Sequence, residues 1–142
     1  MQKPHGLTVS ICLIIIAASS LLTGCMNGLD IEIVGNDQPI FQIKHAGLLG
    51  GFPKCFGEMA VYEGSDDVGV PVWDFRLKSL ATCKPIKQIN YGSVPSDYEE
   101  INPPSRLVTG KSYFVIASAP GGYIGVLRFK KEPNGFKIIK SE

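Results

Sequence analysis

The sequence predicts an all-β domain built as an antiparallel β-sandwich, and three observations lead to this fold class. After the first 30 residues, the apolar runs are short, rich in Val, Ile, Phe and Tyr, and separated by Gly or Pro. No window in that part of the chain has the period of an amphipathic helix. The 16 Gly and 10 Pro residues in a chain of 142 are typical of many turns joining short strands.

Eight short strands are expected after residue 29. They are residues 30–34, 40–45, 58–62, 70–77, 85–91, 111–119, 123–131 and 136–140. The last three alternate apolar and polar residues around the turn sequences 119–122 and 133–135, so they predict an antiparallel meander. Asn134-Gly135 favours a two-residue hairpin turn. Eight short strands in one domain of this size are typical of a sandwich or a small barrel.

Residues 107–117 indicate a more specific fold class. Its sequence, Leu-Val-Thr-Gly-Lys-Ser-Tyr-Phe-Val-Ile-Ala, resembles the L-x-x-G-x-x-Y-x-V-x-A pattern of fibronectin type III and related immunoglobulin-like domains. The resemblance implies a tyrosine corner, in which the Tyr113 hydroxyl bonds back to the upstream backbone. Trp73 is then expected to be a core aromatic residue from the opposite sheet. Pro71 favours an edge or the start of its strand, because proline has no N–H to donate.

The first 24 residues have the layout of a secretory signal peptide. Lys3 is followed by an uncharged apolar stretch, residues 7–22, and then by small residues. The apolar stretch has 16 residues, whereas a helix that crosses a membrane needs about 20. A cleaved signal is therefore favoured over an uncleaved membrane anchor.

The apolar stretch ends in Leu22-Thr23-Gly24-Cys25, which resembles the lipobox of bacterial lipoprotein precursors at all four positions. The resemblance implies cleavage before Cys25, a diacylglycerol thioether on its sulfur, and acylation of its new amino group. Two or three acyl chains anchor a protein stably, whereas one chain holds it only marginally. A membrane is therefore the expected partner of the mature N-terminus.

The residues around Cys25 predict the membrane to which the lipoprotein is delivered and the length of its tether. Met26 departs from the Asp that retains lipoproteins in the inner membrane of enteric-type bacteria, so the resemblance implies the periplasmic face of the outer membrane. The expected divisions are a signal peptide over 1–24, a lipidated cysteine and short tether over 25–29, and the β-sandwich over 30–142. Residues 26–29 reach at most about 14 Å, which keeps the domain close to the membrane.

The cysteines predict one disulfide. Cys12 leaves with the signal peptide and Cys25 carries lipid, so Cys55 and Cys83 remain from the four cysteines of the chain. An even pair in an oxidising compartment favours a disulfide over two separate buried thiols. No metal site is expected, because His45 is the only histidine after residue 24 and no Cys-x-x-Cys pair is present.

Charge and motifs argue against several classes of function. The formal net charge is +1, and loss of Lys3 leaves 13 basic against 13 acidic side chains, so no nucleic-acid partner is expected. A catalytic triad would depend on His45 alone, which lies in no known catalytic motif. The glycine-rich segment 47–57 lacks the Gly-Lys-Ser/Thr ending of a phosphate loop, so no cofactor is expected. We therefore expect a protein that is not an enzyme.

The loop 91–100 is the first candidate binding surface. It combines tyrosine, small polar residues and acids, a composition common in protein interfaces. The candidate contact residues are Tyr91, Asp97, Tyr98, Glu99 and Glu100. Its acids are also the chain's candidates for a glycosidase-type carboxylate pair.

The outward side of strand 111–119 is the second candidate surface. If Tyr113, Val115 and Ala117 face the core, then Phe114 and Ile116 face outward by the period-two alternation of a strand. On the next strand, Ile124 and Val126 alternate with Leu127 and Phe129 in a similar way. Such a side is either covered within the domain or used as a contact surface.

These observations predict a non-catalytic, lipid-anchored periplasmic binding protein. In size, signal, cysteine pair and lack of a linker, the chain is similar to small lipoproteins proposed as immunity proteins of type VI secretion systems. The resemblance implies a protein partner in the periplasm that is blocked by steric occlusion through the 91–100 loop. The alternative is a structural or assembly lipoprotein of an envelope machine. A carbohydrate-acting enzyme that uses Asp97, Glu99 and Glu100 is a third reading.

Overall fold

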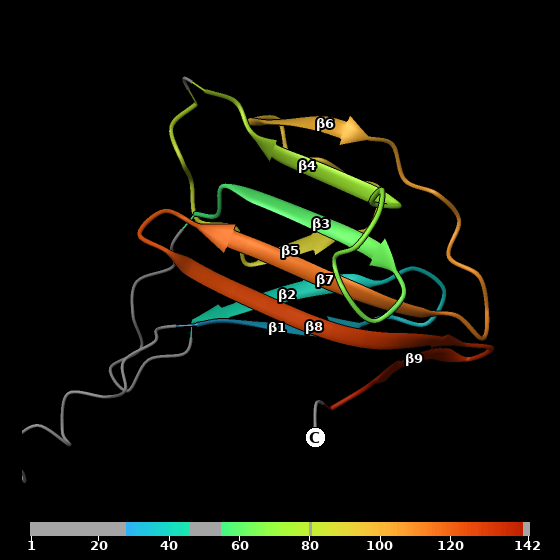
Figure 1. The fold of residues 1–142 in the computed structure, drawn as a ribbon. Helices are drawn as coiled ribbons and strands as arrows, with labels where there is room; N and C mark the ends of the chain where they lie inside the picture. Colours follow the sequence, from blue (N-terminus) through green and yellow to red (C-terminus); the bar gives the residue numbers. More distant parts are fainter. Residues whose placement is uncertain (1–27, 46–54, 80, 141–142) are drawn as a thin grey trace, which may run out of the picture.

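The protein is all-β over the residues that the computed structural model describes, which are 28–45, 55–79 and 81–140 (Figure 1). In this part of the chain there are nine strands and no helix. The strands are β1 (Leu29–Val34), β2 (Ile40–His45), β3 (Glu58–Glu63), β4 (Trp73–Leu77), β5 (Gln88–Asn90), β6 (Tyr98–Asn102), β7 (Ser112–Ala119), β8 (Tyr123–Glu132) and β9 (Gly135–Ile138). The predicted all-β class and its antiparallel pairing are confirmed.

The strands form two sheets, one of three strands in the order β1-β2-β5 and one of six in the order β6-β4-β3-β7-β8-β9. In the smaller sheet, β1 and β2 pair along their whole length, from Leu29 opposite His45 to Val34 opposite Ile40. Alternate residues of β1 are buried, so one side of this sheet faces the core.

In the larger sheet, β7 pairs with β3 on one side and with β8 on the other. β8 then pairs with β9, which completes the predicted meander. The last turn differs from the prediction by one residue, because Glu132 pairs with Gly135 and the two-residue loop is Pro133-Asn134. Gly135 instead begins β9 with a φ of 143°, a conformation that residues with a Cβ rarely adopt.

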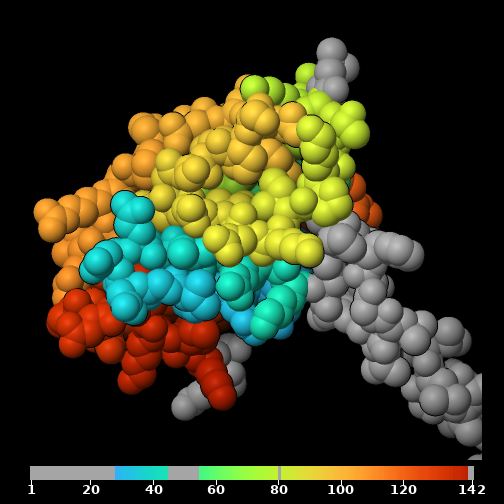
Figure 2. All heavy atoms as spheres, turned by 180° about the vertical axis from the view of Figure 1, so that it is seen from behind, coloured from blue at the N-terminus to red at the C-terminus, as the bar shows by residue number. Residues whose placement is uncertain are grey.

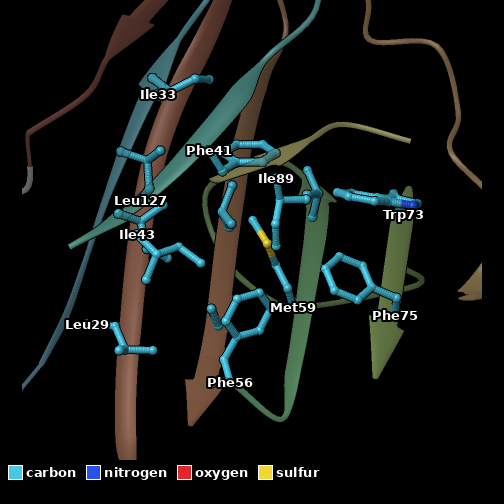
Figure 3. Close-up of a cluster of buried hydrophobic side chains, with 14 of the residues drawn as sticks. Leu29, Ile33, Phe41, Ile43, Phe56, Met59, Trp73, Phe75, Ile89 and Leu127 are labelled. Carbon is cyan, nitrogen blue, oxygen red and sulfur yellow. The ribbon is translucent and has the colours of Figure 1, made fainter. Parts of the chain in front are cut away.

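The two sheets pack face to face around one apolar core (Figure 3). The smaller sheet contributes Phe41, Ile43 and Ile89, and the larger one contributes Met59, Trp73, Phe75 and Leu127, among others. Phe41 and Phe129 join the sheets through a ring contact with centroids 6.2 Å apart. Burial of these side chains is the main favourable term for a domain of this size.

β1 also lies against β8, so the core is closed along this side. The contact needs Gly125, because a Cβ at this position would lie 2.7 Å from both the Leu29 carbonyl oxygen and the Leu29 Cβ. Gly28, which precedes β1, lies close to the Ile124 carbonyl oxygen. The N-terminal end of the described domain is therefore next to the first residues of β8.

The tyrosine corner is present at the start of β7. The Tyr113 hydroxyl accepts a hydrogen bond of 2.8 Å from the backbone N–H of Val108, five residues upstream, and the tyrosine is buried. Trp73 is fully buried, but the expectation that it comes from the opposite sheet is wrong. β4 and β7 belong to the same sheet, with β3 between them. The strand begins at Trp73 rather than at residue 70, after Pro71.

β6 includes residues 98–100, which the sequence predicts to lie in a loop, and the predicted strand 85–91 is reduced to Gln88–Asn90. β6 pairs with β4, with a register shift between Asp74 and Phe75. Tyr98 at its start is buried against Phe56 and Phe75, with ring centroids 5.5 Å away in each case. The next two residues are acidic, so the apolar alternation by which strands are recognised is absent after Tyr98.

Cys55 and Cys83 form the predicted disulfide, with a Cα–Cα distance of 5.2 Å. It ties the residue before Phe56 to the segment between β4 and β5. The expected signal peptide and Cys25 lie outside the described residues. Within the described residues, no helix has the length and apolar character needed to cross a membrane.

Replacing both Cys55 and Cys83 by serine should lower the unfolding free energy by about 3.5 kcal/mol, because the open chain gains conformational entropy over the 28-residue separation. Urea denaturation of the two proteins measures the difference. A count of free thiols in the denatured wild type is the control, and two reactive thiols after residue 25 would contradict the disulfide.

Candidate functional site

The outward side of the six-stranded sheet carries apolar side chains that are exposed (Ile101, Ile124 and Val126) or half-buried (Ala60, Tyr62 and Ile116). We call this surface the open face. It consists of Ala60 and Tyr62 on β3, Ile101 on β6, Ile116 on β7, and Ile124 and Val126 on β8. Ile124 and Val126 are 56% and 52% exposed, whereas Leu127, which points to the core, is buried.

Strand register brings these residues together. Asp74, Ala60, Ile116 and Val126 are successive partners across β4, β3, β7 and β8, so they form one row over the sheet. Paired residues on neighbouring strands share a side of the sheet. The core-facing row beside it includes Val115 and Leu127, as the alternation of β7 and β8 predicts.

One end of the outward side is covered within the domain. The loop between β3 and β4 lies in front of the sheet (Figure 1), where the Arg128 Nε–H donates a 2.8 Å hydrogen bond to the Ser65 carbonyl oxygen. The Arg128 guanidinium lies 5.2 Å from the centroid of the Phe114 ring. Phe114 is buried there, although it points outward as predicted. The apolar outward side is thus covered at Phe114 and open from Ile116 to Val126.

A hollow of about 290 Å³ lies in the open face beside Ile116. Its lining includes the carboxylates of Glu58, Asp67 and Asp74. The guanidinium of Arg76 also lines it, but that charge is paired with Glu99 at 2.6 Å. The open face therefore has an apolar part on β7 and β8 and an acidic part on β3 and β4.

Tyr62 lines the hollow, and its surroundings there change the pKa of its hydroxyl. Partial burial raises the pKa of the Tyr62 hydroxyl, and the neighbouring carboxylates of Asp67, Asp74 and Glu58 raise it further. A phenolate beside three carboxylates would be unfavourable, so the hydroxyl stays protonated and can donate a hydrogen bond. The hollow thus presents carboxylate acceptors, a phenol donor and aliphatic carbon.

The structure buries one residue of the predicted 91–100 site, Tyr98, and bonds an exposed one, Glu100, to a core side chain. Tyr98 is 4% exposed, and its hydroxyl donates a 2.8 Å hydrogen bond to the carbonyl oxygen of Phe56. Glu100 accepts a hydrogen bond of 3.1 Å from the Trp73 indole N–H. Both side chains satisfy or cover parts of the core.

The other three predicted residues lie in different surroundings. Glu99 pairs with Arg76 at the rim of the open face, and Asp97 pairs with Lys84 at 3.2 Å. Tyr91 is half-buried, stacked edge-on against Trp73, and its hydroxyl donates to the Ser105 carbonyl oxygen at 2.7 Å. The five residues therefore do not converge on one surface.

The acids of β6 do not form a carboxylate pair of the glycosidase kind. Glu99 and Glu100 are neighbours on a strand, so their side chains point to opposite sides. In the described part of the chain, no three His, Cys, Asp or Glu side chains gather closely enough to hold a metal ion.

Sequence reasoning identified part of the open face. The alternation of β7 and β8 pointed to Ile116, Ile124 and Val126, but nothing in the sequence linked them to Ala60, Tyr62 or Ile101. Those residues come from separate strands, and their meeting depends on sheet order and register, which local pattern does not encode. In comparisons with known proteins, no family model, no curated protein and no solved structure matches this chain.

Raising the pH should destabilise the protein above about pH 10, the ordinary pKa of tyrosine. Burial raises the pKa of Tyr98 in the folded state, with the charge of Asp97 adding to it, and burial likewise raises the pKa of Tyr91. A raised folded-state pKa contributes stability below the unfolded pKa, and that stability is lost as the pH rises through the folded pKa.

Urea midpoints between pH 8 and 11.5, for the wild type and for Tyr98→Phe, measure this effect. The variant should fall less steeply above pH 10, because it has one phenol fewer to ionise on unfolding. Equal slopes for both proteins would contradict the assignment to Tyr98.

Proposed function

We propose that this protein is a lipid-anchored periplasmic binding protein that holds a protein partner on the open face of its six-stranded sheet. The single observation that carries the proposal is an aliphatic cluster, made of the half-buried Ile116 and the exposed Ile124 and Val126, beside an acidic hollow. Exposed aliphatic side chains that lie together, rimmed by charge, are typical of protein-binding surfaces. The mechanism is steric: the partner is covered by the sheet and no bond is made or broken.

The energetics favour a partner protein over a small ligand. Complete burial of a Val or Ile side chain contributes about 1.5–3 kcal/mol, so Ile116, Ile124 and Val126 together supply a central anchor. The charged rim of Glu58, Asp74 and Arg76 adds selectivity and association rate more than affinity. A flat strand surface offers little enclosure to a small molecule, whereas it suits a second protein surface.

The expected membrane anchor would determine where the open face binds its partner. Gly28 lies beside Ile124, so the chain leaves the domain next to one edge of the open face. With Cys25 lipidated and cleaved from residues 1–24, only residues 26–28 would separate the lipid from the domain, a span of about 10 Å. The partner would then be held against the periplasmic face of the outer membrane.

We also propose that the sandwich is immunoglobulin-like. In immunoglobulin-like domains, strands A, B and E share one sheet and strands C, F and G share the other. Taken in chain order, β1, β2 and β5 have the neighbours of A, B and E, and β3, β7 and β8 have those of C, F and G. The corner at Tyr113 on β7 supports the same assignment. β4, β6 and β9 are additions to that plan.

The immunity-type reading is the preferred form of this binding function. It requires a compact, non-catalytic domain with an exposed protein-binding surface, and the two acids most suggestive of catalysis are bonded to Arg76 and Trp73. Under the alternative, a structural or assembly lipoprotein, the same face would dock onto a component of an envelope machine.

Val126→Lys should reduce capture of the partner at least tenfold, because it places a charge beside Ile116 and Ile124 in the exposed part of the open face. The measurement is a pull-down from envelope extract at high salt, with the processed lipoprotein as bait and mass spectrometry for detection. Val108→Lys is the matched control, since Val108 is 50% exposed and lies away from the open face. Equal capture by Val126→Lys and the wild type would refute the open face as the site.

The identity of the captured protein distinguishes the immunity-type function from the assembly function. If adding this protein abolishes the partner's enzymatic or toxic activity, the immunity-type function stands. If the partner is an envelope component whose own activity is unchanged, the assembly function replaces it. Absence of any stoichiometric partner would contradict both.

Cys25→Ser should leave an uncleaved, unlipidated precursor, because the hydroxyl is a far weaker nucleophile than a thiolate. Metabolic labelling with palmitate and the mass of the mature N-terminus measure the change. Cys12→Ser is the control, because Cys12 lies in the stretch to be removed and should leave processing intact. Normal processing of Cys25→Ser would contradict lipidation at this residue.

A further inference from the structure

A second hollow region lies at the end of the domain where three loops meet. The loops connect β1 to β2, β5 to β6 and β6 to β7. Figure 2 shows these segments together at one end of the molecule, in cyan, yellow and orange. Two adjoining hollows there, of about 360 and 530 Å³, share Gln38, Tyr91 and Arg106 in their linings. We call the two together the end groove. Their volumes fall in the range of small-molecule sites, about 300–1,000 Å³.

The walls of the end groove are held in place by hydrogen bonds. The Tyr91 backbone N–H donates to the Pro39 carbonyl oxygen at 3.0 Å, and the Tyr91 hydroxyl donates to that of Ser105 at 2.7 Å. Lys131 donates through Nζ to the carbonyl oxygen of Asn36 at 3.0 Å. These bonds join all three loops, so the groove is formed before any ligand arrives.

Neutral hydrogen-bonding side chains predominate in the lining. They are Gln38, Asn90, Ser93, Ser105 and Thr109. Amide and hydroxyl groups each donate and accept, which matches the hydroxyl groups of a sugar. Tyr91 and the Pro104 ring add apolar surface, against which the C–H side of a sugar ring can pack.

Arg106 is the cation of the lining that remains available, and it lines both hollows, whereas Asp37, the one acid of the lining, lines only the smaller hollow. No carboxylate of the described residues pairs with its guanidinium, and no hydrogen bond holds it. Lys131, the other cation in the lining, is directed at backbone carbonyl oxygens and lies over the Phe136 ring. A single free guanidinium fits one carboxylate in bidentate geometry better than the several charges of a polyphosphate.

We propose that the end groove binds an acidic saccharide, with the Arg106 guanidinium holding a sugar carboxylate and the side chains of Gln38, Asn90 and Ser93 holding hydroxyl groups. This site is independent of the open face, which lies on the outward side of the larger sheet. It would let the lipoprotein attach to carboxylated glycan while the open face remains free for its protein partner.

The experiment is isothermal titration of the full processed lipoprotein, in detergent micelles, with tetragalacturonate as the acidic probe and maltotetraose as the neutral one. Tetragalacturonate should bind at least tenfold more tightly than maltotetraose. Arg106→Gln should weaken tetragalacturonate binding at least tenfold, as expected for loss of a charge-assisted bidentate contact. Gln38→Ala should weaken it several-fold. Lys87→Gln, which removes an exposed charge outside the groove, should leave it unchanged.

Three results would overturn the proposal. Equal binding by Arg106→Gln and the wild type would exclude the arginine as the anchor. Citrate binding as tightly as tetragalacturonate would show a simple anion contact without sugar recognition. Equal weakening by Lys87→Gln would show a nonspecific charge effect. Val126→Lys separates this site from the open face, because it should abolish capture of the protein partner and leave tetragalacturonate binding intact.

Discussion

The strict alternation of β7 is the constraint on which the rest of the structure depends. Tyr113 and Val115 point into the core, and Phe114 and Ile116 point outward between them. A slip of one residue would exchange the two sets, expose the core residues and break the corner at Val108. Because β7 pairs with a strand on each side, its register also determines which residues of β3 and β8 face outward. The core and the proposed binding surface are therefore two sides of one strand.

Two residues that the sequence suggests as functional, Glu100 and Tyr98, instead make hydrogen bonds at the edge of the core. The indole N–H of Trp73 needs an acceptor, and Glu100 supplies it; the Tyr98 hydroxyl needs one, and the Phe56 carbonyl supplies it. Leaving such a buried donor unpaired would cost about 1–3 kcal/mol. Among the described residues, no buried side-chain nitrogen or oxygen lacks a partner. The acidic loop that resembles a contact surface thus serves chiefly to attach β6 to the sheet.

The two proposed sites differ in the physics they use. The open face offers aliphatic carbon with an acidic hollow, so its selectivity would come from shape and charge around Ile116 and Val126. The end groove offers neutral donors and acceptors around Arg106, so its selectivity would come from hydrogen-bond pattern. Their separation on the fold would let one domain engage a glycan and a protein at once.

The sequence by itself determined the all-β class, most of the strands and the Cys55–Cys83 pair, because each depends on local alternation, turn residues or residue count. The corner at Tyr113 followed from the resemblance of residues 107–117 to the fibronectin type III pattern. The predicted lipid anchor also rests on local pattern. Only the tertiary structure decided that β6 is a strand, that Trp73 shares a sheet with β7, and that the open face gathers residues from four strands. These features depend on pairing between segments far apart in the chain, and pairing energy comes from packing and register that no single segment carries.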